Sequence, residues 1–412
     1  MITREEAERI SAVWAHRESL RRGYPCTPMI DEFELGYIVW SAPPASVATL
    51  PGDIGRTVID RETGEVTSWA ALPGPVIAQM YRDYRATRSD VVHTMDLAAE
   101  LRRSTTRLPT PSVAAHLTLH GRVFRAHGAK SDAPLRHHQL VREYLDQLPA
   151  GHLVRGGDRH AELIVLSDVL HEYDRQRAQA GEPPLTLETA RHLLADAHLE
   201  VFLVREPGDP AGGPTPRGCE SCINAMVHFG VLDWPELAWT EEWRAQPQPV
   251  PEPDRFPPDV AYALAEGGWT LPDLSHDLAV AEIMNAVLPV TGLVHRHHRF
   301  PAADQALHAF PRLRTRRTGP GEQVWIRSIH IDPRRVAHTA DSLGDFATVL
   351  GARLFPLGTE GDDTLLAIDE HGRVFALDQT GEWFLGASLD EALTNLLLGR
   401  AVPKVGPDGT WS

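Results

Sequence analysis

Apolar residues recur along the chain at two spacings, every three to four residues and every second residue, which predict helices and strands respectively. The first helical stretch follows Thr3, and Glu6 three residues later completes a capping box for a helix that reaches about Leu20. Strands are expected at residues 33–40, 56–60 and 66–69, with a second helix at 75–84. The first part of the chain therefore predicts a small α+β domain.

In the middle of the chain, helices are expected to begin at two short motifs. One motif is His160-Ala161-Glu162 and the other is Cys219-Glu220-Ser221-Cys222, and apolar residues at helical spacing follow each. The apolar run 199–204 predicts a buried strand between them, and the Gly/Pro-rich stretch 207–214 predicts a loop. Both motifs are thus expected at helix N-termini.

The last part of the chain mixes both spacings and predicts a second α+β domain. Helices are expected at 258–266, 277–288, 343–350 and 392–398, and strands at 323–331, 365–368, 374–377 and 382–385. The polar stretch 369–373, with a glycine near its end, predicts a hairpin turn between two of these strands.

Two breaks divide the chain into three domains. Prolines at every second position of 247–253 predict a semi-rigid linker, and a softer break lies near residues 87–90, where a helical pattern ends. We therefore expect a small α+β domain at 1–87, a middle domain at 88–246 and a C-terminal domain at 254–405. Three domains suit a chain of 412 residues, because a single core stops growing at about 250–300 residues.

Composition and charge narrow the class of protein. Hydrophobic residues make up 42% and charged residues 23% of the chain, which excludes a wholly disordered protein. No apolar run approaches the about 18 residues of a membrane span, and the polar start lacks a signal peptide, so a cytoplasmic location is expected. The net charge of −16 argues against stable binding to duplex DNA, although residues 87–160 carry a local excess of basic side chains.

Three residues of the two motifs form a candidate zinc site. Zn²⁺ prefers thiolate and imidazole ligands in tetrahedral geometry, and Cys219 and Cys222 in one helical turn lie on one face. A helix N-terminus also stabilises thiolates. With His160 as third ligand, the fourth position stays open for water, as in catalytic zinc sites. Glu162, at the irregular start of its helix, is placed to move a proton between that water and a leaving amine.

Other interpretations of the same residues remain open. The C-x-x-C motif alone also occurs in thioredoxin-like redox proteins. A fourth protein ligand, from His198 or His228, would close the site and make it structural. The two motifs could also share the chain by coincidence. Two further histidine runs, at 137–138 and 295–298, are expected at the surface, because adjacent residues of a helix face different ways.

His-x-Glu together with C-x-x-C resembles the signature of the zinc nucleobase deaminase superfamily. Segments 159–163 and 218–222 look like the YwqJ-type deaminase family in particular, which is associated with bacterial toxin systems, and the resemblance covers residues 88–240. Two features depart from the family pattern. Gly218 stands where proline usually precedes the first cysteine, and the chain after Val231 is short for the later strands of the usual five-stranded sheet.

The resemblance implies a fold and a set of site residues for the middle domain. The implied fold is a cytidine-deaminase-like three-layer α/β sandwich. His160, Cys219 and Cys222 would be the ligands of one catalytic Zn²⁺, and Glu162 would be the general acid and base. The base that is deaminated stays open at this point.

Both outer domains resemble bacterial immunity proteins. Segments 255–269 and 355–393 look like the third type of the SUKH superfamily, whose members are intracellular immunity proteins and protein-binding modules. Segment 57–66 resembles small immunity-type domains. The resemblance implies a SUKH-like α+β domain that binds a toxin or another protein partner. Its own helices, hairpin and apolar strands predict that it folds alone after the linker.

Together these features predict a cytoplasmic, zinc-dependent hydrolase without membrane contact. It would remove the exocyclic amine of a nucleobase in a nucleoside, a nucleotide or a single-stranded nucleic acid, fused to immunity modules of a toxin–immunity system. The alternative is a non-catalytic immunity or partner-binding protein whose deaminase-like domain is structural.

Overall fold

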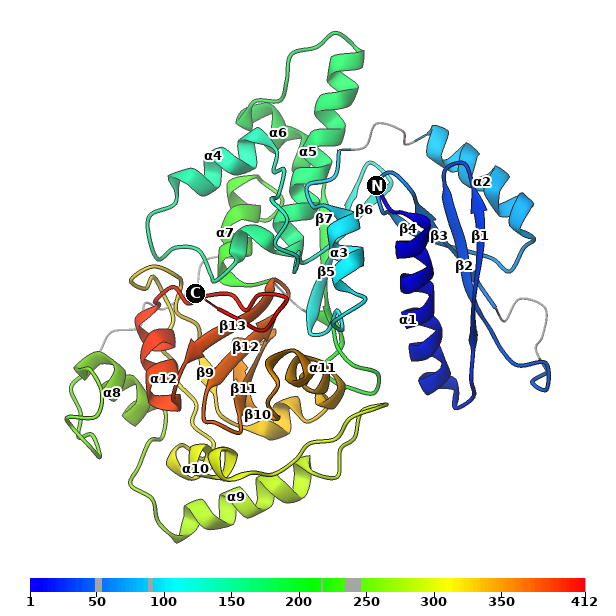
Figure 1. Ribbon diagram of the computed structural model, residues 1–412. Coiled ribbons are helices and arrows are strands. Elements are labelled where there is room, and N and C mark those ends of the chain that lie inside the picture. The colour runs from blue at the N-terminus through cyan, green and yellow to red at the C-terminus, as the bar shows by residue number, and fades with distance from the viewer. Residues whose placement is uncertain (49–53, 88–91, 216–217, 234–245, 412) are drawn as a thin grey trace. The chain divides into compact units, whose positions relative to one another are not determined.

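The computed structural model describes residues 1–48, 54–87, 92–215, 218–233 and 246–411. Its architecture is multidomain, with three antiparallel sheets and helices around them (Figure 1). Two compact units are present, one made of Met1–Leu108 with Ser131–Arg136 and the other of Pro109–Lys130 with His137–Ser412. Among the described residues, no helix combines the length and the apolar character that crossing a membrane requires.

The first unit is built on a four-stranded meander. Helix α1 (Arg4–Arg22) begins at the expected capping box of Thr3 and Glu6 and ends at Gly23, whose φ of +72° suits glycine. The sheet has the order β1-β2-β3-β4, and all its pairs are antiparallel. Its strands are β1 (Thr27–Phe33), β2 (Gly36–Ala42), β3 (Arg56–Asp60) and β4 (Val66–Trp69), and its other helices are α2 (Gly74–Ala86) and α3 (Leu97–Arg103).

Helices cover both faces of this sheet because neighbouring residues of a strand point to opposite sides. Tyr37 and Val39 of β2 pack with residues of α1 and α3, whereas Ile38 packs with residues of α2. The single strand expected at 33–40 is wrong, since a turn at residues 34–35 divides it between β1 and β2. The break expected near 87–90 falls largely outside the described residues.

The second unit begins with an antiparallel sheet in the order β6-β5-β7-β8. Its strands are β5 (Ser112–Leu119), β6 (Arg122–His127), β7 (His198–Val204) and β8 (Gly213–Thr215), and its helices are α4 (Gln139–Gln147), α5 (Ala161–Gln179), α6 (Leu187–Leu194) and α7 (Glu220–His228), with a 3-10 turn η1 (Gly157–Arg159). Helix α5 lies against β5 and β6, and residues 161–170 are all buried. The later strands of the family's five-stranded sheet would follow Val231. Residues 234–245 of that stretch lie outside the described part.

The same unit contains a larger sheet in the order β13-β12-β11-β10-β9. Its strands are β9 (Ile329–His330), β10 (Leu354–Glu360), β11 (Thr364–Asp369), β12 (Val374–Asp378) and β13 (Gly381–Gly386), and the helices around it are α8 (Pro258–Glu266), α9 (Leu274–Val287), α10 (Pro301–Ala309), η3 (Pro333–Val336), α11 (Ala340–Leu350) and α12 (Leu389–Leu398). The strand expected at 323–331 is confined to β9, because the residues before it bond elsewhere: the Trp325 N–H donates to the Leu153 carbonyl.

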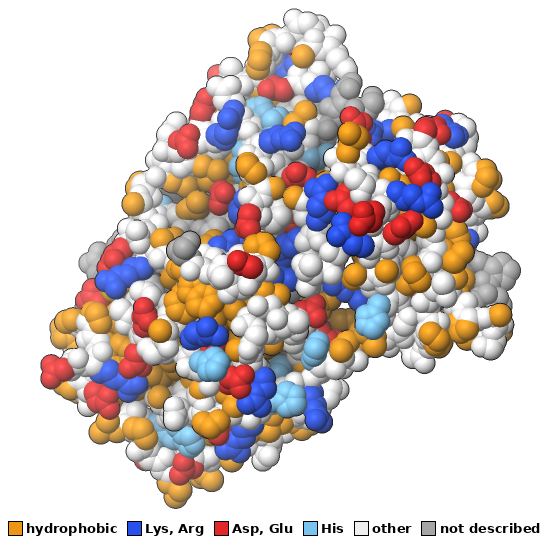
Figure 2. Space-filling model, in the orientation of Figure 1, with side chains coloured by type: hydrophobic (Ala, Val, Ile, Leu, Met, Phe, Trp, Pro, Cys, Tyr) orange, Lys and Arg blue, Asp and Glu red, His pale blue; other side chains and the backbone are white. Residues whose placement is uncertain are grey.

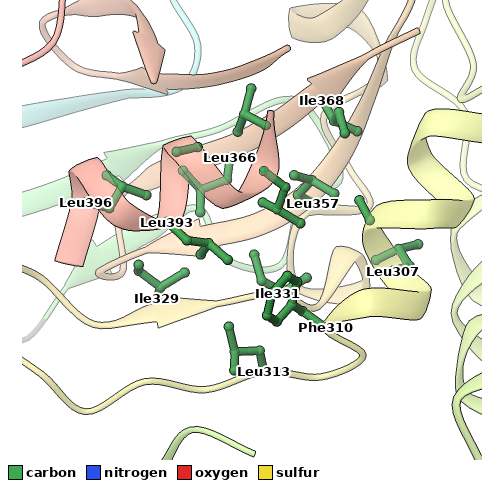
Figure 3. Packing of buried hydrophobic residues seen from close by; sticks show 14 of the residues in the cluster. Leu307, Phe310, Leu313, Ile329, Ile331, Leu357, Leu366, Ile368, Leu393 and Leu396 are labelled. Atoms are coloured by element: carbon green, nitrogen blue, oxygen red, sulfur yellow. The ribbon is translucent and has the colours of Figure 1, made fainter. Parts of the chain in front are cut away.

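Strand alternation again explains how this second sheet is covered. Leu366 and Ile368 of β11 pack with α8, α9, α10 and α12, as Figure 3 shows for residues of α10 and α12. Leu365 and Ala367 of the same strand point the other way, into a cluster with α11. Every residue of β10 and β11 is buried, so these central strands have no solvent-exposed face.

A buried carboxylate ties β3 to α2 in the first unit. Asp60 accepts the Tyr81 hydroxyl at 2.8 Å and the backbone N–H of Thr63 at 2.8 Å, and it pairs with the Arg85 guanidinium. Burial acts to raise the pKa of Asp60, but the Arg85 hydrogen bond and the Thr63 N–H outweigh it and lower the pKa.

Asp60→Ala should destabilise the first unit by about 3 kcal/mol, because Arg85 would lose a buried partner. Tyr81→Phe, which removes one hydrogen bond, should cost about 1 kcal/mol. Since the folded state favours the charged carboxylate, the stabilisation is present above about pH 4 and is lost as pH falls toward the lowered pKa. Hydrogen exchange of the full chain should show faster exchange in β3 and α2, and equal exchange in wild type and Asp60→Ala would contradict this role.

Candidate functional site

Two helix N-termini in the second unit converge on one point. His160 is the N-cap residue of α5 and Cys219 is the N-cap residue of α7, and neither side chain caps its own helix. Cys222 lies in the first turn of α7. A buried hydrogen bond from the Val154 N–H to Ser221 Oγ, at 2.8 Å, joins the segment before α5 to the start of α7. The three side chains are therefore free to face one another.

The ligand atoms of these three residues form a compact cluster. His160 Nδ1 lies 3.4 Å from Cys219 Sγ and 3.5 Å from Cys222 Sγ, and all three atoms lie within 4.8 Å of one another. Tetrahedral Zn–S bonds of about 2.3 Å and Zn–N bonds of about 2.0–2.1 Å would separate sulfur from nitrogen by about 3.6 Å. The cluster fits a metal ion, and two sulfurs with one imidazole nitrogen form a donor set that zinc prefers.

Electrostatics at the cluster favour a charged sulfur. A hydrogen bond from Cys222 and the neighbouring His160 hold the pKa of Cys219 well below its usual value. Burial raises the pKa of the Cys222 thiol, and the adjacent Cys219 raises it further. Burial acts to lower the pKa of His160, but the Cys219 thiolate outweighs it and raises that pKa to about 9. Because thiolates bind metals and thiols do not, Cys219 is prepared as a ligand.

Glu162 lies beside the cluster as a buried acid. Its side chain is 1% exposed, and within the described residues its Oε2 has no hydrogen-bond partner. Burial and the nearby Cys219 raise the pKa of Glu162 to about 7. A carboxyl group with a pKa near neutrality both accepts and donates protons readily.

Gly218 leaves the space that Glu162 occupies. A Cβ atom added at Gly218 would clash with Glu162 Oε1 and would lie 3.5 Å from the Cβ of Cys222. This close approach gives a physical reason for glycine where the resemblance leads one to expect proline, because any side chain here would displace the buried carboxylate.

The histidines considered as a fourth ligand lie outside the cluster. His198 is on β7, exposed and opposite Thr118. His228 lies at the end of α7, where its ring centroid is 4.7 Å from that of Tyr144. Within the part of the chain that the structure describes, the cluster contains only His160 and the two cysteines.

The prediction that both histidine runs lie at the surface is wrong for His137, His138 and His297. His137 is 7% exposed and lies 2.7 Å from the Asp158 carbonyl through Nε2, and His138 Nε2 lies 2.8 Å from Asp174 Oδ2. His297 is likewise buried, 2.8 Å from the Ala337 carbonyl. Each ring finds a polar partner inside the protein, and burial lowers the pKa of all three.

Two charged residues near the cluster escaped the sequence analysis. Asp363 raises the pKa values of His160 and Glu162, and Arg327 contributes to the low pKa of Cys219. Both come from the region of the five-stranded sheet, more than a hundred residues beyond the two motifs. No sequence pattern joins such distant segments, so only the tertiary fold reveals them.

Comparison with known families finds three matches along the chain. Residues 5–88 match the immunity protein 35-like domain, residues 98–231 match the YwqJ-like deaminase, and residues 256–399 match the SUKH-3 immunity protein. The resemblances seen in the sequence motifs are thereby confirmed for all three parts. Comparison with curated proteins and with solved structures gives no match.

The purified chain should contain one metal ion, and Cys222→Ser should lose most of it. Removing a ligand should weaken binding by more than the about 10–100-fold that the loss of an outer hydrogen-bond partner costs. Elemental analysis by mass spectrometry measures the metal content. Cys26→Ser, which changes a cysteine outside the cluster, is the matched control. Equal metal content in both variants would show that the ion binds elsewhere.

Proposed function

We propose that the middle domain is a zinc-dependent deaminase that hydrolyses the exocyclic amine of a nucleobase. The observation that carries the proposal is the buried Glu162 next to the cluster of His160, Cys219 and Cys222, inside a segment that matches the YwqJ-like deaminase. A metal ligand set without a neighbouring acid would suit a structural site equally well. The Glu162 carboxyl beside the cluster favours a catalytic site over a structural one.

The proposed metal is zinc, held by His160 Nδ1 and the two cysteine sulfurs. The separations of these atoms and the low pKa of Cys219 support this assignment. Zinc bound there would supply Lewis-acid activation of a water molecule. Because both cysteines must stay reduced to serve as ligands, a cytoplasmic location suits the proposal.

Glu162 carries the proton transfers in this proposal. Its carboxylate takes a proton from the attacking water and passes it to the ring nitrogen next to the attacked carbon. It then takes the proton of the new hydroxyl group and passes it to the amine nitrogen, so that the C–N bond breaks, ammonia leaves and a carbonyl takes its place. Gly218 leaves the space that the carboxylate occupies, and the side chain of Glu162 is buried. One side chain thus serves both as base and as acid.

The substrate class is a nucleoside, a nucleotide or a single-stranded nucleic acid, since a base inside a duplex cannot reach a buried site. Duplex binding is not part of the proposal. Acidic and basic side chains are interspersed over the face seen in Figure 2, and the chain's net charge is −16.

The second candidate function is that of a non-catalytic binding protein with a structural deaminase-like domain. The matches to two immunity-type families favour it, because SUKH-type modules suggest a toxin or another protein as partner. Deaminase activity separates the two candidates.

Glu162→Gln should lower deamination by about 10²–10⁴-fold while metal stays bound, because the amide keeps the shape of the side chain but cannot move the proton. Ammonia release from nucleosides, nucleotides and single-stranded oligonucleotides, at stoichiometric enzyme over long incubations, detects even slow turnover. Glu188→Gln changes an acid in the first turn of α6 and is the matched control. Unchanged turnover in Glu162→Gln would assign the proton transfers to another group.

Gly218→Ala tests how closely the carboxylate is positioned. The added methyl group must displace Glu162, and a displacement of about 1 Å can cost about 10²-fold in rate. The metal content should stay at the wild-type level. Gly212→Ala is the control, because a Cβ there makes only ordinary contacts, the nearest at 3.4 Å. Equal rates in the two variants would mean that the position of Glu162 does not limit the reaction.

A further inference from the structure

The β12–β13 turn of the five-stranded sheet is buried, which is unusual for a polar turn. In an antiparallel sheet the β10–β11 and β12–β13 turns lie at one end and the β11–β12 turn at the other. Gln379 and Thr380 of the β12–β13 turn are 2% and 0% exposed. His371 in the β11–β12 turn is exposed. Something therefore covers one end of this sheet and not the other.

The covering element is the deaminase domain at its candidate metal site. Gln379 Oε1 accepts the backbone N–H of Ala161 at 2.9 Å, and this bond is buried. Ala161 stands between His160 and Glu162 at the N-terminus of α5. Gly128 lies so close that a Cβ there would clash with the backbone oxygen of Gln379. The Gln379 side chain is thus fixed beside the cluster from two sides.

The β10–β11 turn approaches α7, the other helix that carries candidate metal ligands. Asp363 pairs with Arg327, and Arg327 Nε lies 3.9 Å from Glu220 Oε2 in the first turn of α7. Arg155, from the segment before α5, donates to Glu360 Oε2 at 2.6 Å, at the end of β10. Contacts from the C-terminal domain therefore reach both helix N-termini that form the site.

We propose that the C-terminal domain blocks the deaminase site within the same chain, with the Gln379 amide in the place of the base. A base must come within reach of Glu162 and the metal ligands to react, and the Ala161 N–H is the backbone donor at that point. A primary amide carries a carbonyl acceptor and an amino group, as does the edge of a cytosine or guanine ring. This inference rests on the proposed function, whose site it regulates.

Many contacts between the two domains are polar, which suits an interface that opens, although the His152 ring also lies 6.2 Å from the Trp325 ring and the Arg155 guanidinium lies over the Trp383 ring. The two hydrophobic clusters around the five-stranded sheet contain only residues of the C-terminal domain. Hydrogen bonds connect the domains instead, such as those from the Asp341 and Ser342 N–H groups to Glu206 and from Arg205 to the Asp362 carbonyl. Polar contacts of this kind between domains resemble those of transient protein complexes.

Two substitutions in the full-length chain test the proposal from opposite sides of the contact. Gly128→Ala pushes the β12–β13 turn away from the deaminase domain, and Gln379→Ala removes the acceptor for the Ala161 N–H. Each has a matched control. Gly212→Ala adds the same methyl group where it fits, and Gln323→Ala removes a glutamine that accepts the Ala401 N–H at 2.8 Å in an exposed position.

The proposal predicts two changes in the test variants and none in the controls. Hydrogen exchange in the peptide that contains Ala161 should quicken by about tenfold, the factor expected when one buried hydrogen bond is lost. Ammonia release from the panel of nucleosides, nucleotides and oligonucleotides should rise by a similar factor, because the open form becomes more populated.

Other outcomes overturn the proposal. Unchanged exchange in both variants would show that the turn does not cover the site. Faster exchange with equal or lower turnover would mean that Gln379 does not exclude the substrate. If no variant releases ammonia from any substrate, the proposed function fails, and hydrogen exchange still decides whether the turn is seated on α5.

Discussion

The convergence of the N-termini of α5 and α7 is the constraint on which the site depends. Each helix N-terminus carries a partial positive charge and free N–H groups, which stabilise anions. Here two such ends face one another, and they bring together His160, Cys219 and Cys222. The bond between the Val154 N–H and Ser221 Oγ fixes the approach of the two helices. If the helices separated, the three ligand atoms would no longer lie close enough to share one ion.

The same convergence explains why Glu162 is buried although burial is unfavourable for an acid. A buried acid oxygen without a hydrogen-bond partner, such as Glu162 Oε2, costs free energy inside a protein, and here burial raises the pKa of Glu162 to about 7. Groups under such strain concentrate at functional sites. Gly218 allows the chain to come close enough to enclose the acid. The unfavourable burial of Glu162 is therefore consistent with a role in catalysis.

The sequence predicted the features that depend on local chemistry. The capping box at Thr3 located α1, and the motifs at His160 and Cys219 located the starts of α5 and α7. It failed where distant contacts decide the structure. The stretch 323–331 forms only a two-residue strand because Trp325 bonds to Leu153, outside the sheet. Strand β6 was missed because it is largely exposed and lacks a buried apolar pattern, and β5 was missed although every second residue of 113–119 is buried.

The sequence did not predict the contribution of the C-terminal domain to the site, because distant contacts decide it. Gln379 lies in a short polar turn, which by itself predicts an exposed hairpin. Only the fold places this turn on the N-terminus of α5.

X-ray absorption spectroscopy at the zinc edge of the purified full-length chain identifies the ligands of the metal ion. We expect one zinc per chain with two sulfur ligands at about 2.3 Å and two nitrogen or oxygen ligands at about 2.0–2.1 Å, one of them a histidine. Absence of zinc, or a zinc ion with any other number of sulfur ligands, would contradict the assignment of His160, Cys219 and Cys222 as its site.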